Sequence, residues 1–191
     1  MLTFIGLLSF YKDFTRSALR FTPPTERVIR ESIVLFKEGS IFSNSYNIPF
    51  VLNNRIYQTV QQYCEAKKAL YYGAVEIHER ILSSPFLCEE LTKSISDYNN
   101  NEWQKYAETV MVEAISAKFT QNKVARDALL ATSPRLLGFA NKYDPELSIG
   151  MNIDENGVDK VSNWTGHNKL GNALMSLRFD EYWKDFTVIT D

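Results

Sequence analysis

The stretch that decides the fold is YQTVQQYCEAKKALYY, residues 57–72. It contains neither glycine nor proline and is rich in residues that favour helices, so it predicts an α-helix. Thr59 is the expected N-cap, and Gln62, three positions later, is its expected capping-box partner. We expect one apolar flank of this helix to pack on the rest of the domain; it consists of Val60, Tyr63, Cys64, the stem of Lys67, Leu70 and Tyr71.

A second face of the same helix carries three different polar groups. Gln61, Glu65 and Lys68 are spaced i, i+4 and i+7, which places them within about 60° of one another around the helix. An amide, an acid and an ammonium beside several tyrosines can form the wall of a ligand site. The same spacing also occurs on ordinary amphipathic helices, where charge pairs decorate the surface. The pattern alone leaves both interpretations open.

Composition limits the classes of protein to which the chain can belong. Its 191 residues suit one domain with short appended segments, and 45% hydrophobic residues allow a sizeable core. The formal net charge of −2 gives no electrostatic footprint for binding duplex nucleic acid over a broad surface. A small basic groove is still compatible with that average, so nucleic acid is not excluded as a substrate.

Cysteine and histidine usage argues against a metal site and a redox site. Cys64 and Cys88 form no CxxC pair, and His78 and His167 are far apart in sequence. We therefore expect no metal ion and a reducing compartment. No apolar run reaches about 18 residues, and the apolar segment 1–10 lacks a basic start and a cleavage site, so we expect an intracellular, cytoplasmic protein with no membrane segment.

The order of the remaining patterns outlines one domain. Residues 1–30 are expected to form an N-terminal appendage, in which the Pro23-Pro24 pair breaks regular structure, and residues 181–191 a C-terminal tail. The domain between them, 31–180, is expected to contain a strand at 32–36, a hairpin turn at Asn53-Asn54, helices at 57–72, 74–82, 102–119 and 122–131 (with Asn122 as cap of the last), a short strand at 136–139, a loop at 141–159 and a final helix after 168.

Four blocks of residues, taken in order, resemble those of one family. They are Phe42-Ser43-Asn44 with Pro49-Phe50; Thr59-Val60-Gln61-Gln62-Tyr63 with Ala66 and Lys68; Lys118-Phe119 with Gln121-Asn122 and then Leu129-Leu130-Ala131-Thr132; and Asn168-Lys169-Leu170-Gly171 with Leu174-Met175 and Arg178. Trp103 and the pair Asp144 and Gly150 fall at matching places between the blocks. On these residues the chain is similar to members of the NADAR (YbiA-like) superfamily, over about residues 33–179.

The resemblance implies a fold and an activity. The fold is α+β, a mostly helical single domain with a small β-sheet. The activity is that of an N-glycosidase with no metal or organic cofactor, which hydrolyses the bond between a ribose C1′ and a nitrogen. The substrates that the resemblance implies are ribosylamino-pyrimidine phosphates and ADP-ribose attached to guanine in nucleic acid. The expected partner is therefore an ADP-ribose-bearing nucleotide or nucleic-acid adduct.

The family motif also implies which residues form the site. The catalytic group is expected to comprise Gln61, Lys68 and Asp144, with Gln61 at the position of the catalytic glutamate. Cleavage of a ribosyl C–N bond builds positive charge on the sugar. A carboxylate near the anomeric carbon can stabilise that charge, attack the carbon or activate a water molecule. The expected substrate-binding residues are Ser43, Asn44, Tyr63, Glu65, Gly150, Trp164 and Asn168, of which Asn44 would hold phosphate or ribose together with Lys68.

Gln61 departs from the family motif, because glutamine has the shape of glutamate without its charge. Three interpretations remain. The protein is a binder that is naturally inactive; Gln61 is an introduced Glu→Gln change of the kind used to trap a ligand; or another acid, Glu65 or Asp144, takes over. The intact motif around Gln61 favours the second interpretation.

A second departure affects the loop after Asp144. Leu147 and Ser148 stand where the family often has a tryptophan and a glycine, and Phe139 stands where it has a glutamate. A base-stacking wall is then missing, or is supplied by Trp164 or Tyr143.

Several site assignments have purely structural alternatives. Lys68 can be a solvated surface residue, Asn44 and Asp144 can cap turns, and Asn168 can be the N-cap of the last helix. Core packing is the alternative for three aromatic residues, Tyr63, Trp103 and Trp164.

Overall fold

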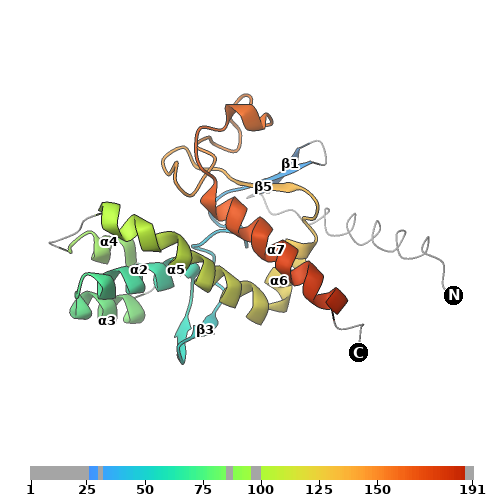
Figure 1. Cartoon of the computed structure of the whole chain (residues 1–191). Coiled ribbons are helices and arrows are strands. Elements are labelled where there is room, and N and C mark those ends of the chain that lie inside the picture. Colours follow the sequence, from blue (N-terminus) through green and yellow to red (C-terminus); the bar gives the residue numbers. More distant parts are fainter. Residues whose placement is uncertain (1–25, 30–31, 85–87, 96–99, 188–191) are drawn as a thin grey trace.

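The computed structural model describes residues 26–29, 32–84, 88–95 and 100–187, so most of the predicted appendage at 1–30 lies outside the described residues (Figure 1). The elements in chain order are β1 (Glu26–Ile29), β2 (Ile33–Phe36), β3 (Phe50–Leu52), β4 (Arg55–Tyr57), α2 (Val60–Tyr71), α3 (Val75–Ser83), α4 (Cys88–Thr92), α5 (Asn100–Gln121), α6 (Lys123–Leu130), β5 (Leu136–Phe139), the 3-10 turn η1 (Val161–Asn163) and α7 (Lys169–Thr187). This architecture confirms the expected α+β class, with helices dominant.

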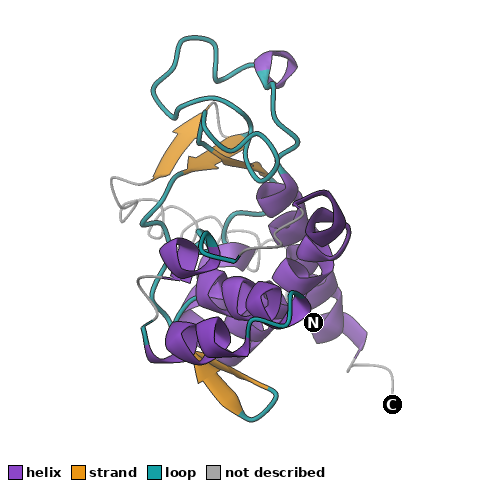
Figure 2. Cartoon of the chain, turned by 90° about the vertical axis from the view of Figure 1, so that its left-hand side faces the viewer, coloured by secondary structure: helices purple, strands orange, loops and turns teal. Residues whose placement is uncertain are grey.

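The strands form one small sheet and one separate hairpin. The sheet has the order β1-β2-β5, with β1 antiparallel and β5 parallel to the central β2. All four residues of β2 are buried because both faces of the strand are covered. The β3–β4 hairpin projects at the opposite end of the molecule from this sheet (Figure 2). Its turn residues Asn53 and Asn54 have positive φ of 52° and 59°, which confirms the hairpin that the asparagine pair predicts.

Helix α2 packs against α3, α4 and α5 and begins as predicted. The Thr59 side chain accepts a hydrogen bond from the backbone N–H of Gln62 at 3.0 Å. The capping-box prediction was wrong in one respect. The Gln62 side chain accepts from the N–H of Gln58, not of Thr59, and its amide donates to the carbonyl of Ile81 at 3.0 Å. Gln62 is therefore a buried polar side chain with partners at both ends, which ties α2 to α3.

The predicted apolar flank of α2 was also partly wrong. The buried residues are Val60, Gln62, Tyr63, Ala66 and Ala69. Leu70 and Tyr71 are instead 46% and 42% exposed. Ala66 and Ala69 of the packed stripe allow neighbouring helices to approach α2 closely, while Leu70 and Tyr71 near its end point outward. The helix is rotated relative to the predicted orientation.

The expected cap of α6 needs correction. Asn122 precedes α6 but makes no side-chain cap there; its amide donates to the carbonyls of Pro49 and Lys118, which ties the end of α5 to β3. The predicted tail at 181–191 begins inside a helix, because α7 continues through Thr187. Similarly, β1 lies within the predicted appendage and pairs with β2.

The loop after β5 has a small core of its own. It covers the sheet face away from the main core, where Ile33, Leu35, Ala140, Ile149, Met151 and Val158 pack together with Trp164. Trp164 also donates its indole N–H to the Val158 carbonyl at 2.9 Å. None of the described helices is long and apolar enough to cross a membrane.

Asn168 joins this loop to the sheet. Its side-chain oxygen accepts from the Phe139 N–H at 3.1 Å, and its amide donates to the Leu137 carbonyl at 2.8 Å, so it pairs with the free edge of β5. Asn168 has a φ of 52° and its side chain does not cap α7. Gly171, one turn into α7, must lack a side chain because a Cβ there would lie 2.3 Å from the Leu137 carbonyl oxygen.

We predict that Asn168→Ala lowers the free energy of unfolding by about 2–4 kcal/mol, because it leaves one buried N–H and one buried carbonyl without partners. Urea denaturation of Asn168→Ala and of the exposed control Asn156→Ala measures this. The control is expected to change stability by less than about 0.5 kcal/mol. Equal stabilities of the two variants would contradict the assigned role of Asn168.

Candidate active site

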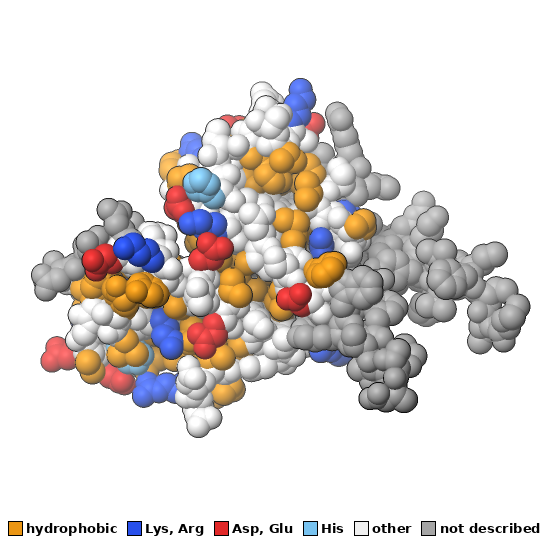
Figure 3. Space-filling view, viewed as in Figure 1, with side chains coloured by type: hydrophobic (Ala, Val, Ile, Leu, Met, Phe, Trp, Pro, Cys, Tyr) orange, Lys and Arg blue, Asp and Glu red, His pale blue; other side chains and the backbone are white. Residues whose placement is uncertain are grey.

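One pocket of about 490 Å³ brings together segments that are far apart in the sequence. Its walls come from the loop at residues 38–45, α2, α4, the first half of α5, the end of β5 with the loop at 141–147, and the start of α7. Figure 3 shows acidic and basic side chains on both sides of the hollow between the helices at left and the loop region above. The volume lies within the range of about 300–1,000 Å³ that small-molecule sites occupy.

The polar face of α2 is one wall of this pocket. Gln61, Glu65 and Lys68 all line it, so the three residues do share one face, as their spacing predicts. None of the three belongs to the packed stripe of Val60, Gln62, Tyr63, Ala66 and Ala69. The rotation of α2 that exposes Leu70 therefore leaves the polar face directed into the hollow.

Asn44 meets the beginning of α2. Its backbone carbonyl accepts from the Gln61 N–H at 2.9 Å, which satisfies one of the unpaired donors in the first turn of the helix. Its side-chain oxygen is buried and, within the described part of the chain, has no hydrogen-bond partner, while the residue lines the pocket. A buried acceptor left open at a pocket wall is suited to a donor from a ligand, such as a ribose hydroxyl.

Lys118 of α5 binds the same loop, residues 38–45, through a buried contact. Its ammonium donates to the Ser43 carbonyl at 2.8 Å and lies 5.6 Å from the centre of the Tyr46 ring. Burial lowers the pKa of Lys118 to about 7, because the charged form is poorly solvated there. In the sequence Lys118 stands out only as part of a motif, and this role was not predicted. No pattern in the sequence distinguishes a buried lysine on α5 from an exposed one.

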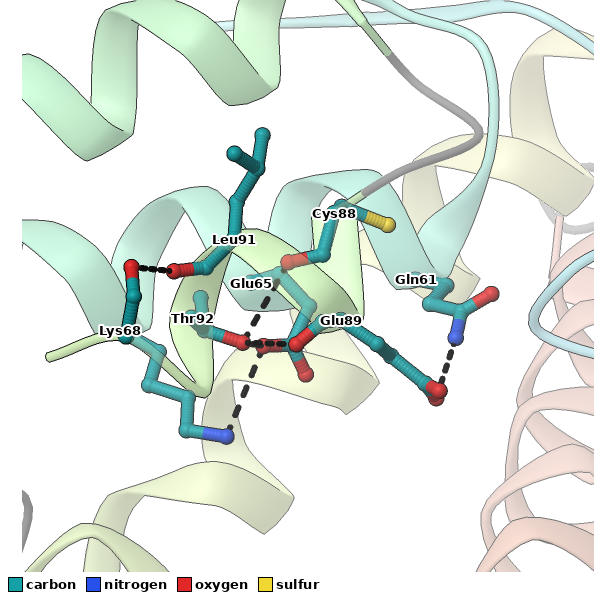
Figure 4. A network of polar contacts seen from close by, with 8 residues as sticks. Gln61, Glu65, Lys68, Cys88, Glu89, Leu91 and Thr92 are labelled. Carbon is teal, nitrogen blue, oxygen red and sulfur yellow. Dashed lines mark hydrogen bonds and ion pairs between the residues drawn. The ribbon is translucent and has the colours of Figure 1, made fainter.

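The Glu65 carboxylate forms a hydrogen bond and an ion pair within the protein. It accepts a hydrogen bond from the Thr92 hydroxyl of α4, and it forms an ion pair with Lys68 at 3.4 Å (Figure 4). The Glu65 and Lys68 side chains are only 16% and 15% exposed. Glu65 therefore links α2 to α4 and partly neutralises the lysine beside it.

Gln61 has a carboxylate partner that the sequence analysis did not identify. The Gln61 amide donates to a Glu89 side-chain oxygen at 2.5 Å, and Figure 4 shows the Glu89 side chain extending from α4 toward Gln61. Both residues line the pocket. The two are 28 positions apart and share no motif, so only the packing of α4 on α2 reveals the pair.

Asp144 combines the two roles that the sequence left as alternatives. Its side chain accepts from the Leu147 N–H at 3.0 Å, which is a turn-capping contact. It also lines the pocket, as does Leu147, which stands where the family often has tryptophan. Asp144 thus fixes the local turn at the pocket rim.

Five residues predicted to bind substrate lie outside the pocket lining. They are Ser43, Tyr63, Gly150, Trp164 and Asn168. Tyr63 is fully buried, its ring stacks edge-on against Tyr57 at 4.9 Å, and its hydroxyl donates to Glu113 at 2.5 Å. Burial is the main cause that raises the pKa of the Tyr63 phenol. The structure therefore gives Tyr63 the core role that was its alternative.

The other four support the pocket from outside. Ser43 is fully buried and contributes its carbonyl to Lys118. Gly150 has a φ of 73°, and a Cβ there would lie 2.4 Å from the Thr165 hydroxyl oxygen. Trp164 packs in the core beneath the loop, and Asn168 pairs with β5. None of these four residues is in the pocket lining.

Aromatic side chains lie on two walls of the pocket. Trp103 of α5 and Tyr143 of the loop both line the pocket, and Tyr143 is 83% exposed. Tyr143 is one of the two predicted substitutes for the missing tryptophan; Trp164, the other, is not in the lining. Trp103 lies 5.7 Å from the ring centre of Tyr71, which holds it in place.

The pocket is acidic. Its lining contains two lysines, Lys68 and Lys169, against the six carboxylates of Glu38, Glu65, Glu89, Glu108, Asp144 and Glu146. Lys169 pairs with Glu146 at 2.5 Å, and this contact is the main cause that lowers the pKa of Glu146. Such a pocket stabilises positive charge that develops on a bound molecule. No group of three or more described His, Cys, Asp or Glu side chains is arranged to hold a metal ion.

Comparisons with known proteins agree on one family. The model of the NADAR domain matches residues 33–180. The chain is 30% identical over 157 residues to a protein of Escherichia coli strain K12 named N-glycosidase YbiA, covering 80% of this chain and 91% of that protein. It is 27% identical over 124 residues to an N-glycosidase of Acanthamoeba polyphaga mimivirus, covering 64% and 73%. The solution NMR structure of E. coli YbiA superimposes with a TM-score of 0.65 at 26% identity, covering 85% of this chain and 92% of that one.

The low pKa of Lys118 predicts a specific pH dependence of stability. The unfolded chain holds this proton up to a pKa near 10.5, whereas the folded protein releases it near 7. The free energy of unfolding therefore rises with pH above about 7, by an amount of order 1–2 kcal/mol by about pH 8.5. Above about pH 9 the buried thiol of Cys88, whose pKa is raised to about 11, acts in the opposite direction.

Lys118→Met is expected to remove this rise, because methionine fills a similar volume and carries no proton. Urea denaturation from about pH 6 to about pH 8.5 would measure it, with the exposed Lys123→Met variant as control. The assignment would be wrong if Lys118→Met and the unaltered protein showed the same slope.

Proposed function

This chain belongs to the NADAR family, and we propose that it is an N-glycosidase that hydrolyses the bond between a ribose C1′ and a nitrogen. The observation that carries the proposal is the convergence of Gln61, Lys68, Asn44 and Asp144, from three separate segments, on one pocket. These are the positions where the family motif places its site. Relatives that bear the name N-glycosidase, at moderate identity, support the same class of reaction.

The electrostatics of the pocket suit this reaction. A ribosyl C–N bond breaks through a transition state with positive charge on the sugar. Six carboxylates around the pocket favour such charge, and the partly enclosed walls strengthen the interaction. A pocket for an anionic transition state would instead need an excess of donors and cations.

We propose that the substrate is an ADP-ribosyl adduct of guanine in nucleic acid. In this assignment Lys68 and Lys169 contact phosphate, and the open side-chain oxygen of Asn44 accepts from a ribose hydroxyl. Trp103 or Tyr143 stacks against a base. Asp144 positions a hydroxyl group or water at the rim. The pocket volume of about 490 Å³ is compatible with a nucleotide-sized ligand.

Two other functions are each supported by a specific observation. A non-catalytic module that binds ADP-ribose or a related nucleotide is supported by Gln61, since an amide cannot supply the charge of the family glutamate. A glycosidase of ribosylamino-pyrimidine phosphates is supported by Leu147, which replaces a family tryptophan and leaves a smaller stacking surface.

The test compares the unaltered protein with Gln61→Glu. Each is incubated with an oligonucleotide that carries ADP-ribosylated guanine, and released ADP-ribose is measured by mass spectrometry; the same oligonucleotide without the adduct is the control. Release by either protein supports the proposed function. Release by Gln61→Glu alone places the reacting carboxylate at position 61.

Two results would contradict the proposal. Calorimetric binding of ADP-ribose without release by either protein favours the binding module. Neither binding nor release rules out this substrate, and ribosylamino-pyrimidine phosphates are then tested in the same assay.

A further inference from the structure

We infer that Glu89 supplies the carboxylate that acts at the anomeric carbon, in place of the family glutamate at position 61. The inference rests on the proposed function, and it assigns a catalytic residue that lies outside the family motif. Its basis is the hydrogen bond between the Gln61 amide and the Glu89 carboxylate at the wall of the pocket.

The geometry places the negative charge beside the position where the family carries it. Gln61 is held in the first turn of α2 by its backbone bond to the Asn44 carbonyl, so its side chain has a fixed origin. Glu89 approaches from α4, and 2.5 Å separates its oxygen from the Gln61 nitrogen (Figure 4). The negative charge that the family glutamate would carry at position 61 is thus carried by Glu89, which is hydrogen-bonded to Gln61 from a different helix.

The amide at position 61 is suited to this arrangement. A glutamine N–H₂ group donates to a carboxylate and orients it. A glutamate at position 61 would instead face Glu89 with a second negative charge, and the two would repel unless they shared a proton. Gln61 and Glu89 are therefore complementary, and the glutamine is the residue that fits beside the acid.

Four of the other five carboxylates of the pocket are engaged elsewhere, and the fifth, Glu108 of α5, is exposed and not hydrogen-bonded to position 61. Glu65 is bound by Thr92 and Lys68, and Asp144 accepts from a backbone N–H of its own turn. Glu38 accepts from the Ser45 hydroxyl, and Glu146 pairs with Lys169. Among the described carboxylates, Glu89 alone is hydrogen-bonded to the residue at position 61, and its second oxygen has no hydrogen bond or ion pair within this part of the chain.

The anchoring of α4 keeps Glu89 at this place. The Thr92 hydroxyl, one turn along α4, donates to Glu65 of α2, and Cys88 next to Glu89 is buried. The short helix is thereby fixed to α2 through Thr92 and to the main core through Cys88. A carboxylate on a helix anchored in this way is held within reach of the pocket.

The reaction step balances with one water molecule. The Glu89 carboxylate takes a proton from water while the water oxygen bonds to C1′ and the C1′–N bond breaks, its electron pair moving to the leaving nitrogen. Glu89 then returns the proton to that nitrogen. The products are the free ribose hydroxyl and the N–H of the base, and the carboxylate is regenerated.

The experiment measures release of ADP-ribose from the modified oligonucleotide by the full chain and five variants. Glu89→Gln removes the charge and keeps the shape, and Glu89→Ala opens space for added formate. Glu90→Gln is the matched control, because Glu90 is the next residue of α4, exposed and outside the pocket lining. Gln61→Glu and the exchange variant Gln61→Glu/Glu89→Gln complete the set, and thermal unfolding verifies that each is folded.

The expected result is that Glu89→Gln lowers kcat by a factor of about 10²–10⁴, the usual loss when a general base is removed. Glu90→Gln is expected to leave kcat unchanged. Formate is expected to restore release by Glu89→Ala, which a purely structural role for Glu89 would not allow. The exchange variant is expected to regain release relative to Glu89→Gln, since it again pairs one acid with one amide.

Three results would overturn the inference in different ways. Full activity of Glu89→Gln, with release by the unaltered protein, moves the catalytic group elsewhere and keeps the proposed function. Release by Gln61→Glu but not by the unaltered protein assigns the role to position 61 and also keeps the function. No release by any variant removes the proposed function together with this inference.

Discussion

The structure depends on the burial of one stripe of helix α2. Ala66 and Ala69 let the neighbouring helices approach, and Gln62 ties the stripe to α3 through its bond to the Ile81 carbonyl. This buried polar side chain is tolerated because its carbonyl oxygen and its NH₂ group both have hydrogen-bond partners. Once this stripe is fixed, the helix has no rotational freedom. Gln61, Glu65 and Lys68 are then directed into the pocket as a consequence of core packing.

The other wall of the pocket depends on a buried cation. The buried Lys118 ammonium donates a hydrogen bond to the Ser43 carbonyl, and its pKa is lowered because burial removes water from the charged form. The next residue, Asn44, accepts a hydrogen bond from the start of α2 with its carbonyl, and its buried side-chain oxygen has no hydrogen-bond partner among the described residues. The loop and the helix are thus positioned by one continuous set of contacts from α5 to α2. On the far side, Asn168 performs the equivalent task by attaching the start of α7 to β5.

The predicted site residues therefore divide into two groups. Gln61, Lys68, Asn44 and Asp144 line the pocket, while Ser43, Tyr63, Gly150, Trp164 and Asn168 shape it from the core. Two of the sequence blocks contribute to both groups, because Ser43 lies beside Asn44 in one block and Tyr63 lies between Gln61 and Lys68 in another. The acidic lining, with the Gln61–Glu89 pair at one wall, is the chemical feature on which the proposed glycosidase activity depends.

The sequence by itself determined the local elements. The glycine-free stretch at 57–72 predicted α2, the Asn53-Asn54 pair predicted the hairpin, and i, i+4, i+7 spacing placed three polar groups on one face, because these features depend on near neighbours along the chain. It could not determine which stripe of α2 is buried, where Lys118 and Tyr63 lie, or that α7 extends through Thr187. Only the tertiary structure decided that Glu89 is hydrogen-bonded to Gln61. That contact arises from the packing of α4 on α2, and no spacing pattern in the sequence predicts it.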